Sequence, residues 1–256
     1  GKEIDIDDFD TDTVNPQKQL IVWDPENHEI VGGYRIFFFD RECRECDIAK
    51  LASSAYFNFS DKFMKKYLPH LMELGRSFVH PDYQSKNRGR KSLFALDNLW
   101  DGLGAIIIDH HRIKYLFGKV TMYRHFNQKA RDMILYFLKR HFSDPEDLAV
   151  VKEPAEIDIH EESMRKIFTG RSYKENYKIL SQEVRILNET IPPLINAYMN
   201  LSPTMRTFGT FINHKFGDVE ETGIMITLRD IYVEKINRHL ASYKKDFEIR
   251  WFSRDS

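Results

Sequence analysis

The side chains best suited to chemistry lie close together between residues 73 and 91. Glu73 supplies a carboxylate that can accept a proton, and Arg76 can hold a carboxylate through two parallel hydrogen bonds. His80 follows, with an imidazole that titrates near neutral pH. Because residues three apart in a regular strand face opposite sides, Glu73 and Arg76 reach one pocket only across a bulge. A basic stretch then surrounds a single glycine, with the residues Lys86, Arg88, Gly89, Arg90 and Lys91.

Several common catalytic motifs are absent from the sequence. No run matches the P-loop, the zinc-protease motif HExxH or the HxxxxD spacing of glycerolipid O-acyltransferases. The run 75–79 lacks the last glycine of the serine-hydrolase motif, and the run 102–107 lacks the third glycine of a dinucleotide motif. Cys43 and Cys46 are the only cysteines, and without a second pair of ligands they predict no metal site.

Composition narrows the class of protein further. The 256 residues include 38 basic and 39 acidic side chains, so the net charge of −1 gives no general attraction to nucleic acid or anionic lipid. The longest apolar run, 103–108, is far shorter than the ~20 residues of a membrane span. The acidic start of the chain is the opposite of a basic export signal. We expect a cytoplasmic protein with no nucleic-acid partner and at most peripheral contact with the inner membrane face.

Strand and helix patterns alternate along the chain and predict an α/β fold. Apolar runs on either side of a turn sequence predict a hairpin at 19–23 and 30–39. Residues 41–72 have helical spacing, and further strands are predicted at 74–79, 114–122, 147–151 and 223–228. Helical stripes of apolar residues occur at 93–103, 130–141, 177–187 and 233–243. We expect an acidic arm at 1–17, a core at 18–155 and a helical C-terminal extension at 156–256 that packs on the core as a single unit.

The run from Glu73 to Gln84 resembles the fourth strand and following loop of the GNAT superfamily of N-acyltransferases. More narrowly, the chain resembles the bacterial lyso-ornithine-lipid and glycine-lipid synthases, some of which carry a hemolysin-like label. The resemblance implies a mixed, mostly antiparallel central sheet flanked by helices. Other segments also match the family, and they occur in the family's order across residues 19–241. They are 24–35, 99–102, 115–120, 130–132 and 191–194, together with Tyr198, Gly209 and Phe216.

The resemblance also implies how the acyl donor binds. In this fold the fourth and fifth strands splay apart and accept a phosphopantetheine arm as an extra strand. The loop that normally cradles the coenzyme A pyrophosphate keeps one glycine here, and its cations suit the acidic face of an acyl carrier protein. We expect acyl carrier protein or coenzyme A to carry the acyl group, with no permanently bound cofactor. The implied donor-binding residues are Phe78, Val79, Gln84, Lys86, Arg88, Gly89, Arg90 and Lys91.

Catalytic roles follow from the same resemblance. N-acylation needs a neutral amine, so a general base must take a proton, and Glu73 is the first candidate. Its alternative is a structural pairing with a neighbouring cation. His80 is a second candidate for proton transfer, Tyr136 lies where many GNAT enzymes keep a general acid for the leaving thiolate, and Arg76 would hold the acceptor's carboxylate. An apolar tunnel for the acyl chain would draw on Phe37, Phe38, Phe39, Tyr198, Met199, Met205, Phe208 and Phe211.

The predicted reaction is the transfer of a long 3-hydroxylated acyl group to the amino group of a small amino acid, of the glycine or ornithine type. The product would be a lyso-aminolipid, and the missing HxxxxD motif assigns any second, ester-linked chain to a separate O-acyltransferase. Two alternatives remain open. The strand from Glu73 to Val79 also resembles that of acyl-homoserine-lactone synthases, whose N-terminal pattern is missing here. The degraded glycine loop also fits a GNAT-shaped module that binds carrier protein or lipid without catalysis.

Overall fold

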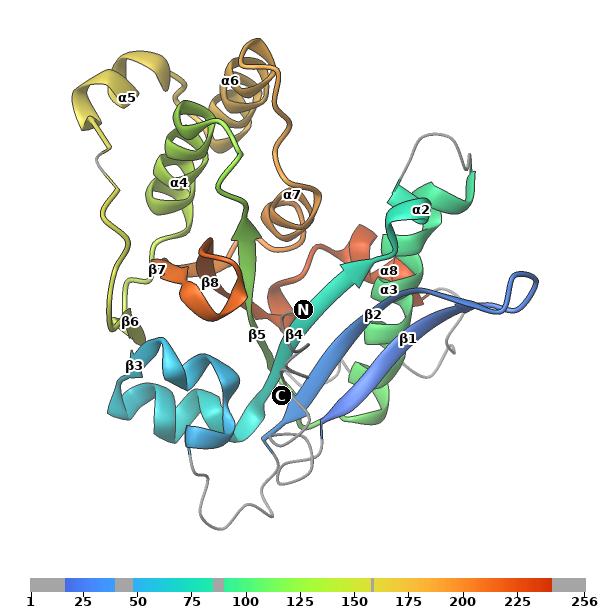
Figure 1. Ribbon diagram of the computed structural model, residues 1–256. Coiled ribbons are helices and arrows are strands. Elements are labelled where there is room, and N and C mark those ends of the chain that lie inside the picture. The colour runs from blue at the N-terminus through green and yellow to red at the C-terminus, as the bar shows by residue number, and fades with distance from the viewer. Residues whose placement is uncertain (1–16, 40–47, 85–89, 158, 241–256) are drawn as a thin grey trace, which may run out of the picture.

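The fold is built on a six-stranded sheet (Figure 1). The computed structural model describes residues 17–39, 48–84, 90–157 and 159–240. The strand order is β1-β2-β4-β5-β8-β7, and every neighbouring pair is antiparallel except β4 and β5, which run parallel. This arrangement confirms the mixed, mostly antiparallel α/β fold expected from the sequence. The strands are β1 (Lys18–Asp24), β2 (Glu29–Phe38), β4 (Leu71–Val79), β5 (Tyr115–Met122), β7 (Arg206–Asn213) and β8 (Val219–Thr227).

The predicted hairpin is present as β1 and β2. Its turn is held by the Asp24 carboxylate, which accepts hydrogen bonds from the backbone N–H groups of Glu26 and Asn27 at 3.0 and 3.3 Å. His28 completes the turn in the left-handed region, with φ 55°. The Tyr83 hydroxyl donates to the second oxygen of Asp24 at 2.9 Å, which ties the segment after β4 to this hairpin.

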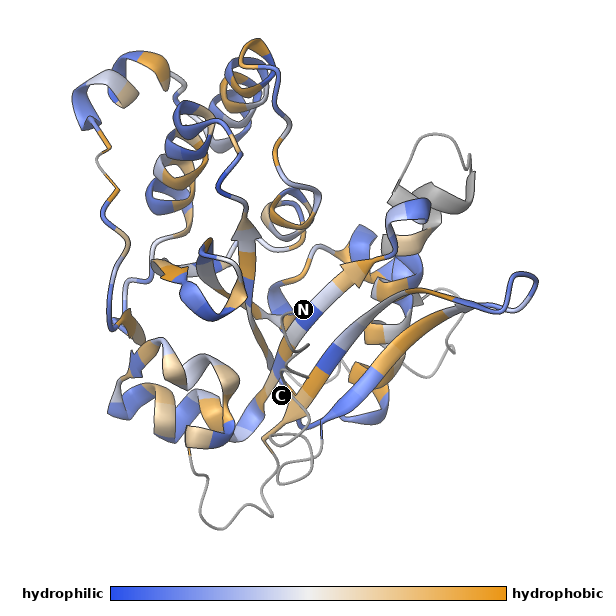
Figure 2. Cartoon of the chain, in the orientation of Figure 1, coloured by the Kyte–Doolittle hydropathy of each residue, from blue (hydrophilic) through white to orange (hydrophobic). Residues whose placement is uncertain are grey.

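Helices cover one face of the sheet. The larger hydrophobic core forms there, between α3, α4, α6 and α7 and the sheet residues Leu74, Leu116 and Ile226. Hydrophobic and hydrophilic residues alternate along α4 and α6, as the mixed colours of these helices in Figure 2 show. No helix among the described residues is long and apolar enough to cross a membrane. The helices are α2 (Pro81–Gln84), α3 (Arg90–Asp109), α4 (Gln128–Phe142), α5 (Glu161–Ile167), α6 (Tyr173–Ile186), α7 (Pro193–Met199) and α8 (Val233–Leu240).

Short elements cover the opposite face. The helical turns η2 (Ala52–Ala55) and η3 (Phe63–Tyr67) lie there with a second sheet, in which β3 (Phe57–Phe59) pairs with β6 (Ala149–Val151). They form a second hydrophobic core with Phe117 of the main sheet. Because successive side chains of a strand point to opposite faces, β5 supplies residues to both cores.

The structure corrects parts of the sequence prediction. Residues 41–72 are not simply helical, because they contain β3 and the first residues of β4. β7 was not expected, since Gly209, at φ 91°, interrupts its alternating pattern, and its register with β8 shifts between Thr207 and Thr210. β8 includes 223–227 of the strand predicted at 223–228, but it begins earlier, at Val219, and residue 228 starts the turn η7 (Leu228–Asp230). Two strands of the main sheet therefore come from the part of the chain expected to form a helical extension.

The strands β4 and β5 separate partway along their length. Their parallel register runs only from Leu71 opposite Tyr115 to Leu74 opposite Gly118. Beyond this point β4 stays paired with β2, and β5 stays paired with β8. Figure 1 shows the two strands diverging from their shared start. The resulting gap, which we call the splay, begins at Leu74 and Gly118.

A bulge in β4 lies just beyond the start of the splay. Gly33 of β2 pairs with Phe78, and Arg35 pairs with Gly75, so Tyr34 alone stands opposite two residues of β4. One of those two, Arg76, has a left-handed backbone with φ 48°. A bulge of this kind increases the local twist and turns β4 away from its neighbour. This is the bulge that the spacing of Glu73 and Arg76 requires if both are to serve one pocket.

The end of the parallel register gives a test of stability. A Cβ atom at Gly118 would lie 2.8 Å from the Leu74 carbonyl oxygen, so Gly118→Ala must push the two strands apart. We expect it to lower the free energy of unfolding by about 1–3 kcal/mol in urea titrations. Gly75→Ala is the matched control, because a Cβ there meets nothing within 4 Å, and it should change stability by less than about 1 kcal/mol. Equal losses in the two variants would contradict this account.

Candidate active site

The donor-side residues of β4 lie along the splay. Phe78 is 49% exposed, and Val79 is half-buried at the end of the strand. Behind them, Gly32 and Gly33 of β2 allow a close approach, since a Cβ at either position would lie within 3.0 Å of Phe78 atoms. β4 is thus held tightly to β2 on one side and turned away from β5 on the other. Beyond Leu74 and Gly118 the facing edges of β4 and β5 are therefore not paired with each other, as the addition of an extended ligand as a strand would require.

Most of the predicted basic loop lies outside the described residues. This applies to Lys86, Arg88 and Gly89, and also to the two cysteines of the sequence. Gln84 ends α2, while Arg90 and Lys91 begin α3. A helix N-terminus therefore follows the loop directly, as anion binding by such a loop requires. The donor-binding roles of these residues stay predictions.

His80 lies where β4 gives way to α2. Its backbone N–H donates to the Val31 carbonyl oxygen at 2.7 Å, and its ring Nδ1 lies 3.3 Å from the backbone nitrogen of Asp82. The ring also meets Tyr83 edge-on, with centroids 6.2 Å apart. These contacts describe a residue that shapes the start of α2. Its predicted part in proton transfer stays a prediction.

Glu73 is buried in the middle of the sheet, on the face that carries the short elements. Its Oε1 accepts hydrogen bonds from the Ser53 backbone N–H at 2.8 Å and the Ser53 hydroxyl at 2.6 Å, and its Oε2 accepts from the Ala52 N–H at 2.8 Å. The carboxylate thus caps the first turn of η2. Burial raises the pKa of Glu73, although these hydrogen bonds and the charge of Lys119 act in the opposite direction. A raised pKa makes Glu73 a better proton acceptor, but both of its oxygens already hold η2 in place.

Arg76 projects from the bulge toward the segment that joins β7 to β8. Its guanidinium carbon lies 5.2 Å from the centre of the Phe216 ring, which is a cation–π contact. Phe216 ends the turn η6 (His214–Phe216), which begins directly after Asn213. The predicted carboxylate-binding residue therefore lies at the splay, and the ring that it contacts, Phe216, is close in sequence to Asn213 of the cluster described next.

A polar cluster next to the splay was not predicted from the sequence. Lys119 follows the last residue of the parallel register, and its Nζ lies 3.2 Å from Glu221 Oε2. The same oxygen accepts a hydrogen bond from Asn213 Nδ2 at 2.8 Å, and Asn213 Oδ1 accepts from the Tyr56 hydroxyl at 2.9 Å. Lys119 also lies over the Tyr56 ring, 4.5 Å from its centre. We call Lys119, Glu221, Asn213 and Tyr56 the Lys119 cluster.

The Lys119 cluster, Glu73 and Arg76 together give this face of the splay two carboxylates and two cations. Lys119 acts electrostatically on Glu73, which links the cluster to the middle of β4. The members of the cluster come from β5, β7, β8 and the segment before β3, so no local spacing connects them. Such an arrangement is complementary to a small zwitterion, whose carboxylate seeks a cation and whose ammonium seeks a carboxylate.

Comparison with known proteins agrees with this geometry. A model of the acetyltransferase (GNAT) domain matches residues 1–91. A protein of Bacteroides thetaiotaomicron named glycine N(alpha)-acyltransferase is 53% identical over 244 residues, which are 95% of this chain and 72% of that protein. The protein of the same name from Phocaeicola vulgatus is 52% identical over 246 residues, 96% of this chain and 75% of that protein. The chain belongs to this family of GNAT N-acyltransferases. Among solved structures, an aminoglycoside 6'-N-acetyltransferase complexed with coenzyme A matches with a TM-score of 0.31 and 10% identity, over 85% of this chain and 76% of its own.

Two buried tyrosines lie on the opposite, apolar face of this acyltransferase. Tyr198 of α7 lines a small cavity at the start of the splay, together with Leu74 and Gly118. Tyr34 of β2, opposite the bulge, faces Tyr198, but its hydroxyl makes no hydrogen bond of regular geometry among the described residues. Burial raises the pKa of Tyr34 well above the ordinary value and that of Tyr198 to about 12. Both phenols are therefore neutral hydrogen-bond donors near neutral pH.

Tyr136, the predicted general acid, lies elsewhere on this face of the acyltransferase. It is half-buried on α4 and stacks on Phe168, with ring centroids 5.4 Å apart. Its catalytic role stays a prediction. The tyrosine that lines the cavity at the splay is Tyr198, which was expected in the acyl tunnel rather than as a proton donor.

The Lys119 cluster can be tested by a double-mutant cycle. Lys119→Met leaves the buried Glu221 carboxylate without its cation, which should lower the free energy of unfolding by about 3–5 kcal/mol. Glu221→Gln in the same background should recover much of that loss, because no uncompensated charge remains. Urea unfolding of the four proteins measures the coupling energy. Additive losses would show that the two side chains do not depend on each other.

Glu73 gives a prediction about pH. Because the folded protein holds the Glu73 proton more tightly than the unfolded chain does, the associated stabilisation is fully present below pH 4.5 and is lost as the pH rises through the raised pKa. Glu73→Gln removes this titration. The difference in unfolding free energy between wild type and variant should therefore be largest near pH 4 and decrease toward pH 8, in urea titrations followed by circular dichroism. A difference that grows with pH would mean that the native pKa lies below the ordinary value.

Proposed function

We propose that this N-acyltransferase transfers a long, 3-hydroxylated acyl group from a carrier thioester to the α-amino group of glycine. The proposal rests on one structural observation, the splay between β4 and β5 with its bulge at Arg76. The names of the two relatives support glycine as the acceptor. The product is an N-acylglycine, a lyso-aminolipid that a separate O-acyltransferase would then modify.

The acceptor binds on the polar face of the splay. Arg76 pairs with the glycine carboxylate, which directs the amino group toward the gap between the strands. The ammonium group loses a proton to a carboxylate, either directly or through water, and Glu73 is the proposed base. Since both oxygens of Glu73 hold η2, proton transfer there requires that one of those hydrogen bonds be exchanged for the substrate or for a water molecule.

Acyl transfer then follows from the neutral amine. Its nitrogen attacks the thioester carbonyl carbon, a C–N bond forms, and the C–S bond breaks. The thiolate that leaves takes up a proton, so that glycine and acyl thioester give N-acylglycine and a free thiol. The neutral phenols at the start of the splay are hydrogen-bond donors that can stabilise the developing charge.

The carrier is proposed to be acyl carrier protein. The four cations at 86–91 suit its acidic surface, and the phosphates of coenzyme A are the alternative ligand for the same charges. An acyl-homoserine-lactone synthase would instead require S-adenosylmethionine and release a lactone. A binding module would hold the carrier with no turnover.

The proposal is tested with purified protein, glycine or ornithine, and the same acyl group on acyl carrier protein or coenzyme A. Mass spectrometry should detect N-acylglycine, with one free thiol released for each amide formed. Arg76→Ala should raise the KM for glycine by about 10- to 100-fold and leave the KM for the donor within about twofold.

Arg165→Ala is the matched control, because Arg165 is an exposed arginine of α5 that pairs only at the surface. Its kinetic constants should equal those of the wild type. Folded protein that forms no amide with either acceptor would refute the proposal. A lactone formed in the presence of S-adenosylmethionine would favour the first alternative, and tight binding of the carrier without turnover would favour the second.

A further inference from the structure

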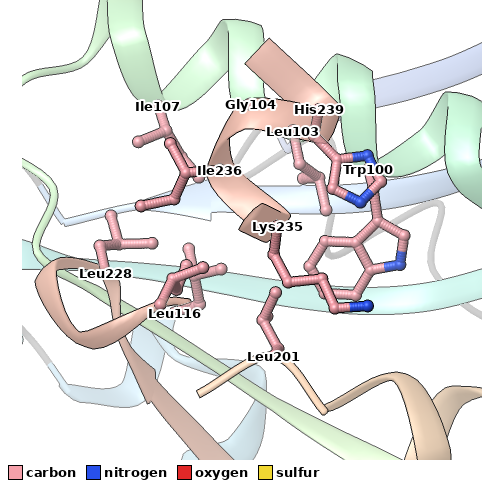
Figure 3. Close-up of a pocket in the computed structure, with 11 residues that line it drawn as sticks. Trp100, Leu103, Gly104, Ile107, Leu116, Leu201, Leu228, Lys235, Ile236 and His239 are labelled. Carbon is pink, nitrogen blue, oxygen red and sulfur yellow. The ribbon is translucent and has the colours of Figure 1, made fainter. Parts of the chain in front are cut away.

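An apolar cavity of about 60 Å³ lies between α3 and α8 on the helical face of the sheet (Figure 3). Trp100, Leu103 and Ile107 of α3 form one wall. Leu116 of β5 and Ile236 of α8 approach from the other side, as Figure 3 shows. The polar members of the lining are Lys235 and His239, both from α8 (Figure 3). A cavity walled in this way offers almost nothing to a polar ligand and favours hydrocarbon.

α8 forms one wall of the cavity and α3 forms another. Trp100 and Ile107 are seven residues apart on α3, which corresponds to about 10 Å along the helix axis. α8 is fixed to the same helix by an ion pair between Arg238 and Asp97 and by a hydrogen bond between His239 Nδ1 and Asp101 Oδ1 at 2.8 Å. Apolar walls that extend over this length of α3 suit an alkyl chain.

The same cavity lies next to the splay. Leu116 lines both this cavity and the small cavity at the start of the splay, whose other walls include Gly118 and Tyr198. The Tyr198 ring also meets Trp100 edge-on, with centroids 5.5 Å apart. One leucine and one pair of aromatic rings therefore separate the place where the thioester would lie from the space under α8.

We propose that the cavity between α3 and α8 holds the distal part of the donor's alkyl chain and sets the chain length that the enzyme accepts. This inference rests on the proposed function, and it assigns the chain to the helical face, opposite the polar face that takes the acceptor. It also replaces the tunnel expected from the sequence. Of the residues expected there, Phe39, Phe208 and Phe211 lie in the core of the other face, and Tyr198 lines the route.

The kinetic test uses acyl thioesters of 8 to 16 carbons with glycine. Each methylene that enters the cavity should raise kcat/KM about fourfold until the cavity is full. Ile107→Trp and Ile236→Phe each shorten the cavity by roughly two or three methylenes. Each variant should therefore lower the ratio of kcat/KM for C16 to kcat/KM for C8 by at least ~15-fold. Val233→Phe is the control, because Val233 lies on α8 but is exposed and outside the cavity lining, and it should leave the ratio within about twofold. Equal effects on C8 and C16 would overturn the proposal.

A binding test separates this inference from the proposed function. Trp100 lies in the wall, so its fluorescence should transfer to bound cis-parinaric acid and to the methyl ester of that acid. The chain has two other tryptophans, Trp23 and Trp251, so Trp100→Phe should lower the transfer more than Trp23→Phe does. It should keep binding, as followed by the probe's own emission, and Ile236→Phe should weaken binding at least tenfold. These results hold whether or not glycine is acylated. Binding of the acid but not of the ester would instead assign the site to an anion held by Lys235, and transfer that Trp100→Phe lowers no more than Trp23→Phe does would place the probe elsewhere. Either outcome would overturn the proposal.

Discussion

The parallel contact between β4 and β5, only four residue pairs long, is the constraint on which the rest of the structure depends. At its last pair, Gly118 brings its backbone against the Leu74 carbonyl oxygen, closer than any side chain would permit. Beyond that pair the bulge at Arg76 turns β4 away. The strands are therefore joined firmly at one end and opened at the other. Both the gap and the residues that border it follow from this geometry.

The opened sheet separates two kinds of chemistry by its two faces. Alternation along β5 sends Leu116 to the helical face, and sends Phe117 and Lys119 to the opposite one. The charged groups of the proposed acceptor site thus lie on the face that carries the short elements, with Glu73 and the Lys119 cluster. The apolar side chains of the proposed chain site lie on the helical face, between α3 and α8. The N-acylglycine product has a polar end and an apolar end. To occupy the proposed acceptor site and the proposed chain site together, it would have to pass through the splay.

Much of this architecture was predictable from local sequence. The hairpin, the helical stripes and the need for a bulge between Glu73 and Arg76 all depend on spacing within a few residues. The Lys119 cluster was not predictable, because its members come from four distant segments and meet only in the folded sheet. β7 was not predicted because Gly209 interrupts its alternation of apolar and polar residues. Glu73 was predicted to be a general base or to pair with a neighbouring cation, but its hold on η2 depends on backbone N–H groups, which no sequence pattern marks.

The pairing of β5 with β8 has a consequence for how the chain folds. Tyr115 of β5 lies opposite Thr227 of β8, so β5, in the middle of the sheet, pairs with a strand more than a hundred residues later in the chain. Contacts of such separation slow folding, because the loop between them must be closed before they stabilise anything. During synthesis, β4 and β5 would emerge long before β8 and would expose the edge of β5 in the meantime. A fragment that stops near residue 155 would keep that edge permanently and would tend to associate with itself.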